Sequence, residues 1–80
     1  MGLDKYMKVS RLIKRREVAK EMIDLGYVSI NGKIAKPSSE VKEGDVLLIT
    51  SPSGKTMKVK IVKILLVASI KDASSMYEVM

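Results

Sequence analysis

Nine cationic side chains in the first 36 residues are the groups of this sequence with the clearest capacity for chemistry. They are Lys5, Lys8, Arg11, Lys14, Arg15, Arg16, Lys20, Lys33 and Lys36. Long, flexible cations that converge on one surface bind phosphate, and arginine adds a planar geometry that matches two phosphate oxygens at once. A charged face can also serve solubility alone, as most basic runs do. The clustering of these cations in one half of the chain favours contact with a polyanion.

The residue inventory excludes several classes of enzyme. The chain has no cysteine and no histidine, so disulfides, thiolate or imidazole metal ligands and histidine-dependent triads are absent. One short acidic segment holds Glu40, Glu43 and Asp45, but it lacks the ligand spacing of a calcium loop, and a solvated turn is the favoured interpretation. We therefore expect no catalysis, no cofactor and no metal.

Size and charge predict one small domain, over residues 1–80, with an anionic partner. Fifteen Lys and Arg against nine Asp and Glu give a net charge of +6 at pH 7. Hydrophobic residues make up 46% of the chain, enough for a core, although 80 residues lie near the lower size limit of a single domain. The longest strictly apolar run, 64–68, is too short to cross a bilayer, and the first residues lack the apolar segment of a signal peptide. We expect a cytoplasmic protein without membrane contact.

An amphipathic helix is expected to carry the central cations. Between residues 16 and 25, one side is apolar at helical periodicity, and it consists of Val18, Ala19, Met22 and Ile23. Arg16 and Lys20 follow one edge of that apolar side. Gly26 comes next, at the position where a left-handed cap favours a residue without a Cβ. The helix is therefore predicted to end there.

A tight hairpin follows the helix. Residues 27–30 and 33–36 read as strands around Asn31-Gly32, the dipeptide best suited to the two positive φ angles of a type I′ turn. We expect this turn to have a structural role and to position Lys33.

A short first helix and further strands complete the expected fold. Residues 4–10 have helical periodicity, and 11–15 read as a connection that mixes apolar anchors with cations. Residues 72–75 read as a polar turn. Further strands are expected over 46–49, 57–61 and 76–80. The predicted class is α+β, with two or three N-terminal helices packed on a small, mostly antiparallel sheet of four to five strands.

The apolar segment 64–70 admits two interpretations. A longer buried strand, or a turn packed on the core, is favoured because so short a chain has few other places to find a core. The alternative is an exposed patch that binds a protein partner.

The pattern of motifs resembles a known family. The residues that carry the resemblance are Leu3-Asp4-Lys5-Tyr6-Met7, Arg16, Ala19, Ile23, Gly26, Val28, Ile30-Asn31-Gly32, Pro37-Ser38 and Gly44-Asp45. Together they resemble the RNA-binding domain of ribosomal protein S4, which contains the αL RNA-binding motif. Residues 9–16 and Met76-Tyr77 are similar to the small stand-alone bacterial members that bind the large ribosomal subunit, in ribosome quality control or after heat shock.

The resemblance implies a function by binding. Expected partners are rRNA and tRNA on a large ribosomal subunit with an obstructed nascent chain, where such proteins stabilise peptidyl-tRNA during template-free tailing. A quality-control factor on the same subunit is a further expected partner, and the chain is expected to be a monomer. Three tyrosines are the only aromatic residues, which indicates recognition of RNA by backbone and shape. Two alternatives stay open: a protein-binding adaptor that uses 64–70, and an RNA-targeting accessory of an RNA-modifying enzyme.

Two departures from the family pattern affect the expected RNA face. Gly2 stands where the family usually has an arginine, which removes one cation. Arg15 stands where a serine caps the second helix, which removes a side-chain acceptor worth about 1 kcal/mol. The uncapped N–H groups are then open to a phosphate.

Overall fold

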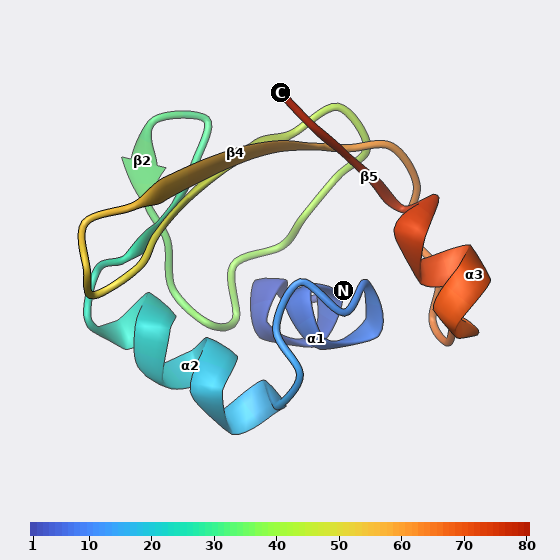
Figure 1. The fold of residues 1–80 in the computed structure, drawn as a ribbon, viewed down its shortest axis with the longest axis horizontal. Coiled ribbons are helices and arrows are strands. Elements are labelled where there is room, and N and C mark those ends of the chain that lie inside the picture. Colours follow the sequence, from blue (N-terminus) through green and yellow to red (C-terminus); the bar gives the residue numbers. More distant parts are fainter.

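The computed structural model describes residues 1–80 as three helices and a five-stranded sheet (Figure 1). In chain order the elements are α1 (Leu3–Val9), α2 (Arg16–Asp24), β1 (Val28–Ile30), β2 (Lys33–Ile34), β3 (Val46–Thr50), β4 (Thr56–Ile61), α3 (Ile70–Ser74) and β5 (Tyr77–Val79). The sheet order is β2-β1-β3-β4-β5, and all neighbours are antiparallel. Two N-terminal helices and an antiparallel sheet confirm the predicted class, and the third helix lies near the C-terminus.

The core lies between one face of the sheet and the helices α1 and α2, which Figure 1 shows on the same side of the sheet. Alternate strand residues point toward this core, and they are Val28, Leu47, Ile49, Val59 and Ile61. Leu3, Tyr6 and Met7 fill it from α1. The opposite face of β4 carries Lys58 and Lys60, both exposed as predicted.

The helix α2 ends as predicted but buries a narrower face. Leu25 is its C-cap, and Gly26 follows in the left-handed conformation with φ +83°. Only Ala19 and Ile23 are fully buried, whereas Val18, predicted to face the core, is 43% exposed. Val18 is exposed because the core-facing ridge of α2 runs through Ala19 and Ile23, four residues apart, and Val18 lies 100° around the helix axis from Ala19, away from Ile23.

The hairpin turn between β1 and β2 has the predicted backbone. Asn31 has φ +51° and Gly32 has φ +85°, as a type I′ turn requires. The Asn31 amide also bridges to β3, because its Nδ2 donates to Asp45 (3.0 Å) and its Oδ1 accepts from the Val46 N–H (2.9 Å). The turn is therefore structural, and both flanking strands are shorter than predicted.

The predicted polar turn over 72–75 is wrong, because these residues belong to α3 and its C-cap. Ser69 is the N-cap of this helix, and its Oγ accepts from the Asp72 N–H at 3.1 Å. This serine lies three residues before an acidic side chain, a recognised start signal for a helix. The predicted last strand is confirmed as β5, which forms the sheet edge beside β4.

The segment 64–70 is not a buried strand. Residues 62–69 form no regular structure, and only part of the segment packs on the core, through Ile64, Leu65 and Ala68. The exposed fractions of Leu66 and Val67 are 70% and 85%. The chain leaves the sheet just before this segment, where the N–H groups of Val62 and Lys63 both donate to the Met76 carbonyl. The longest helix has nine residues, and no helix meets the length and apolarity needed to span a membrane.

Candidate nucleic-acid interface

The cationic face is built on α1, α2 and the connection between them. Tyr6 and Met7 are fully buried and fix the rotation of α1, so that Lys8 projects into solvent. Leu12 and Ile13 pack against the core and hold the connection, as predicted for apolar anchors. The cations around them are therefore displayed from a fixed backbone.

Three shallow depressions share Arg16 and together collect most of the predicted cations. The central groove, about 660 Å³, is lined by Lys8, Lys14, Arg15, Arg16, Glu17 and Val18. The Asp4 basin, about 540 Å³, is lined by Gly2, Asp4, Arg16, Lys20, Pro37, Ser38 and Glu40. The side pocket, about 380 Å³, is lined by Lys5, Lys8, Val9, Arg11, Arg16, Leu66, Val67 and Ala68.

Seven of the nine predicted cations, Arg16 among them, thus line the three depressions, and two do not. Lys33 and Lys36 are exposed on the hairpin and line none of the three depressions. Lys36 directly precedes Pro37, at the border of the Asp4 basin. The hairpin cations are therefore peripheral to the main cationic face.

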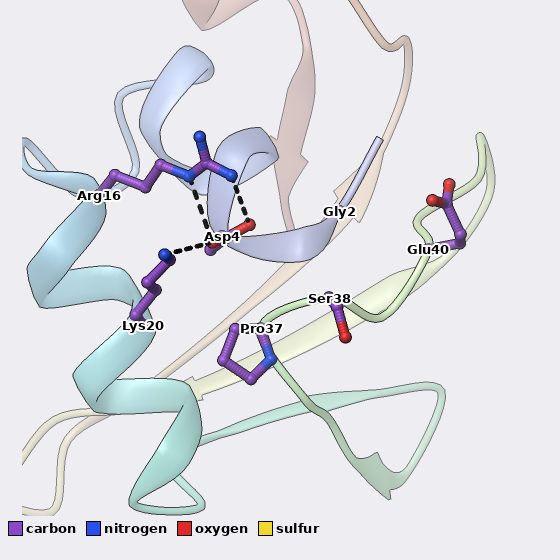
Figure 2. Close-up of a pocket in the computed structure, with 7 residues that line it drawn as sticks. All are labelled: Gly2, Asp4, Arg16, Lys20, Pro37, Ser38 and Glu40. Atoms are coloured by element: carbon purple, nitrogen blue, oxygen red, sulfur yellow. Dashed lines mark hydrogen bonds and ion pairs between the residues drawn. The ribbon is translucent and has the colours of Figure 1, made fainter.

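A buried carboxylate organises two of these cations (Figure 2). Asp4 Oδ2 lies 3.2 Å from Arg16 Nε and 3.9 Å from Lys20 Nζ, and Arg16 Nη2 lies 3.5 Å from Asp4 Oδ1. The Asp4 side chain is only 6% exposed, whereas those of Arg16 and Lys20 are 50% and 54% exposed. The buried carboxylate therefore pairs with both cationic side chains, and about half of the surface of each side chain stays accessible to a ligand.

The Asp4 pairing was not predicted from the sequence, in which Asp4 was named only among the residues that carry the family resemblance. Its Oδ1 also accepts the Lys5 N–H at 2.7 Å. A buried acid needs a charged or hydrogen-bonding partner. The position of Asp4 between the apolar residues Leu3 and Tyr6 was the one sign in the sequence that such a partner exists. Arg16 is twelve residues away on another helix, so no local spacing could identify it.

The N-terminus of α2 opens onto the central groove. Its N-cap, Arg15, has an extended backbone and makes no side-chain cap hydrogen bond, as its departure from the family pattern predicts. The first N–H groups of a helix point outward and favour anions when no side chain caps them. The groove thus combines backbone donors with Lys8, Lys14 and Arg15.

The second departure, Gly2, lies in the Asp4 basin (Figure 2). A Cβ at this position would lie 3.3 Å from both Asp4 Oδ1 and the Pro37 carbonyl oxygen. An arginine here would therefore need small shifts of its neighbours, but no change of backbone conformation, since φ is −73°.

The tyrosines do not form a stacking platform. Tyr6 is fully buried and donates from its hydroxyl to the Met76 carbonyl at 2.8 Å. Burial raises the pKa of the Tyr6 phenol above its ordinary value, and the nearby Tyr77 adds to the rise. Neither Tyr27 nor Tyr77 lines any of the three cationic depressions.

Sequence comparisons identify close relatives over the whole chain. The S4 domain model matches residues 1–47. A Halalkalibacterium halodurans protein named RQC P-site tRNA stabilizing factor is 46% identical over 79 residues, which cover 99% of this chain and 89% of that protein. The Bacillus subtilis protein of the same name is 45% identical over 80 residues, covering 100% of this chain and 92% of that protein.

A solved structure has the same fold. The trimeric structure of Vibrio cholerae Heat Shock Protein 15 matches with a TM-score of 0.89 and 29% sequence identity. The match covers 100% of this chain and 81% of the Vibrio chain. Sequence and fold agree on the relationship, and the chain belongs to the S4 domain family.

Proposed function

We propose that this chain binds structured rRNA and tRNA on the large ribosomal subunit and acts in ribosome-associated quality control. It stabilises peptidyl-tRNA on subunits with an obstructed nascent chain while template-free tailing proceeds. Relatives of nearly the same length, named as RQC P-site tRNA stabilizing factors, support this assignment. The observation that carries it is the presence of seven cations in three depressions that share Arg16.

The central groove is the main contact with the RNA backbone. Lys8, Lys14 and Arg15 neutralise phosphates there, and the uncapped N-terminus of α2 donates backbone hydrogen bonds to one of them. Arg16 and Lys20, held by Asp4, extend the phosphate contacts toward the loop that follows β2. Such contacts fix position and orientation and carry little sequence information.

The chain contributes binding and no chemistry of its own. Its action requires only that two RNA molecules, rRNA and tRNA, be held in a fixed relation. A monomer in the cytoplasm, where ribosomes work, is sufficient for this task. A quality-control factor on the same subunit would contact surfaces outside the cationic face.

Sedimentation with defined ribosomal subunits tests the proposal. The purified chain is mixed with large subunits that carry peptidyl-tRNA and with empty large subunits, and each mixture is pelleted. We expect more chain to pellet with the tRNA-loaded subunits. The double variant Lys14→Ala/Arg15→Ala should pellet less, and the control Lys58→Ala/Lys60→Ala, which removes the same charge from the far face of the sheet, should pellet normally. A chain that stays in the supernatant with both subunits would overturn the proposal.

A further inference from the structure

The side pocket differs from the other two depressions because one of its walls is apolar. Leu66, Val67 and Ala68 form this wall. The rest of the lining consists of Val9 and the cations Lys5, Lys8, Arg11 and Arg16, and no acidic residue lines the pocket. Lys8 and Arg16 also line the central groove, so the two depressions adjoin. Phosphates bound in the groove would therefore lie beside the pocket.

Arg11 joins the two sides of the pocket. Its backbone has φ +62°, a left-handed conformation that is strained for a residue with a Cβ. Its guanidinium Nη2 donates to the Ala68 carbonyl at 3.3 Å, which ties the α1–α2 connection to the apolar wall. Arg11 directly follows Ser10, the C-cap of α1, a position where a left-handed residue commonly ends a helix.

We propose that the side pocket receives the base of one unpaired nucleotide from a structured RNA. This inference rests on the proposed function and deepens it. The phosphates beside the nucleotide contact Lys8 and Arg16, and the base lies against Leu66 and Val67 with the Arg11 guanidinium beside it. Extruded bases are bound between apolar side chains and guanidinium planes, which an aromatic-poor protein can supply.

The observations favour a nucleotide over a protein segment. A stable protein interface buries on the order of 1,000 Å² or more around an apolar centre, and the four apolar residues of this pocket offer much less. Four cations without an acid suit an anionic ligand that also has an apolar face. A nucleotide combines both properties, and the adjoining phosphate groove would deliver it to the pocket.

Three matched RNA hairpins test the inference by fluorescence anisotropy at one salt concentration. One is fully paired, the second has a single extrahelical nucleotide, and the third has an abasic residue at that place. We expect the extrahelical hairpin to bind about fivefold more tightly than either of the others. Leu66→Ser should reduce this preference to less than about twofold, and the matched control Leu25→Ser, another exposed leucine, should retain it.

Arg11→Gly is a second test variant, and it should fold as well as the wild-type chain. Glycine adopts the left-handed backbone without strain, so the melting temperature should not fall, while the preference for the extrahelical hairpin should. Equal binding of all three hairpins by the wild-type chain would overturn the inference while leaving the proposed function intact. If Leu66→Ser keeps the preference for the extrahelical hairpin but weakens binding to ribosomal complexes, the apolar wall binds a protein partner and the inference is wrong. Failure to bind any hairpin would overturn both.

Discussion

Asp4 has two opposite effects on RNA binding: its charge repels phosphate, and its ion pairs order Arg16 and Lys20. Replacing Asp4 by asparagine shows which effect is larger. The asparagine oxygen can still accept the Lys5 N–H, but the negative charge that holds Arg16 and Lys20 is lost. Net charge rises from +6 to +7, since one acid becomes neutral. If charge alone governed RNA affinity, Asp4→Asn would bind more tightly.

The magnitudes favour the opposite result. A phosphate on the outer side of Arg16 lies on the order of 7 Å from the Asp4 carboxylate. Because this carboxylate is only 6% exposed, an effective dielectric constant of about 20 applies, and the repulsion is about 2.4 kcal/mol, reduced to about 1 kcal/mol by physiological salt. Arg16 and Lys20, once released, must instead be ordered by the RNA, at about 0.5–1.5 kcal/mol for each side chain. The ordering cost exceeds the relieved repulsion, so we expect Asp4→Asn to weaken RNA binding about three- to tenfold.

Anisotropy titration of a labelled RNA hairpin measures this effect, with Asp24→Asn as the control. Asp24 is exposed at the end of α2 and pairs with no cation, so its substitution changes net charge equally without releasing a side chain. We expect Asp24→Asn to leave affinity unchanged or slightly higher. If Asp4→Asn strengthens binding as much as Asp24→Asn does, the ordering argument is refuted.

Three further predictions concern single positions. Burial raises the pKa of Tyr6 in the folded state, so the unfolded chain loses the phenolic proton at a lower pH than the folded chain does. The free energy of unfolding should therefore fall above pH 10, by about 1.4 kcal/mol per pH unit. Tyr6→Phe should lack this fall, and identical urea-unfolding profiles for both chains above pH 10 would contradict the burial argument. Gly26→Val should cost about 1–3 kcal/mol because φ is +83°, and an unchanged melting temperature would disprove it. Gly2→Arg should tighten RNA binding if the new side chain reaches a phosphate. The plot of log association constant against log salt should then be steeper by about 0.7–0.9, and a slope identical to wild type would exclude that contact.

Local backbone chemistry made much of the fold predictable. Gly26 ends α2, and Asn31-Gly32 forms the hairpin, because few other residues adopt positive φ at low cost. The α3 helix escaped prediction because five residues are too few to show an apolar period.

The candidate site was only partly predictable. The cations stood out by type and clustering, but their organisation depends on contacts between distant segments. Asp4 on α1 pairs with Arg16 on α2, and Arg11 donates to the carbonyl of Ala68, 57 residues away in the sequence. Such pairs follow from tertiary packing, which periodicity does not encode. The exposure of Leu66 and Val67 likewise depends on where the chain leaves the sheet after β4.

The salt dependence of RNA affinity tests the central claim that one cationic face binds phosphates. If five or six phosphates are contacted, the logarithm of the association constant should fall against log salt with a slope of roughly −4 to −5. Lys14→Ala/Arg15→Ala should make this slope shallower by about 1.5, since two contacts are lost. Lys58→Ala/Lys60→Ala should leave it unchanged, because those lysines lie on the opposite face of the sheet. A nearly flat slope for the wild-type chain, or equal flattening by both double variants, would contradict the account.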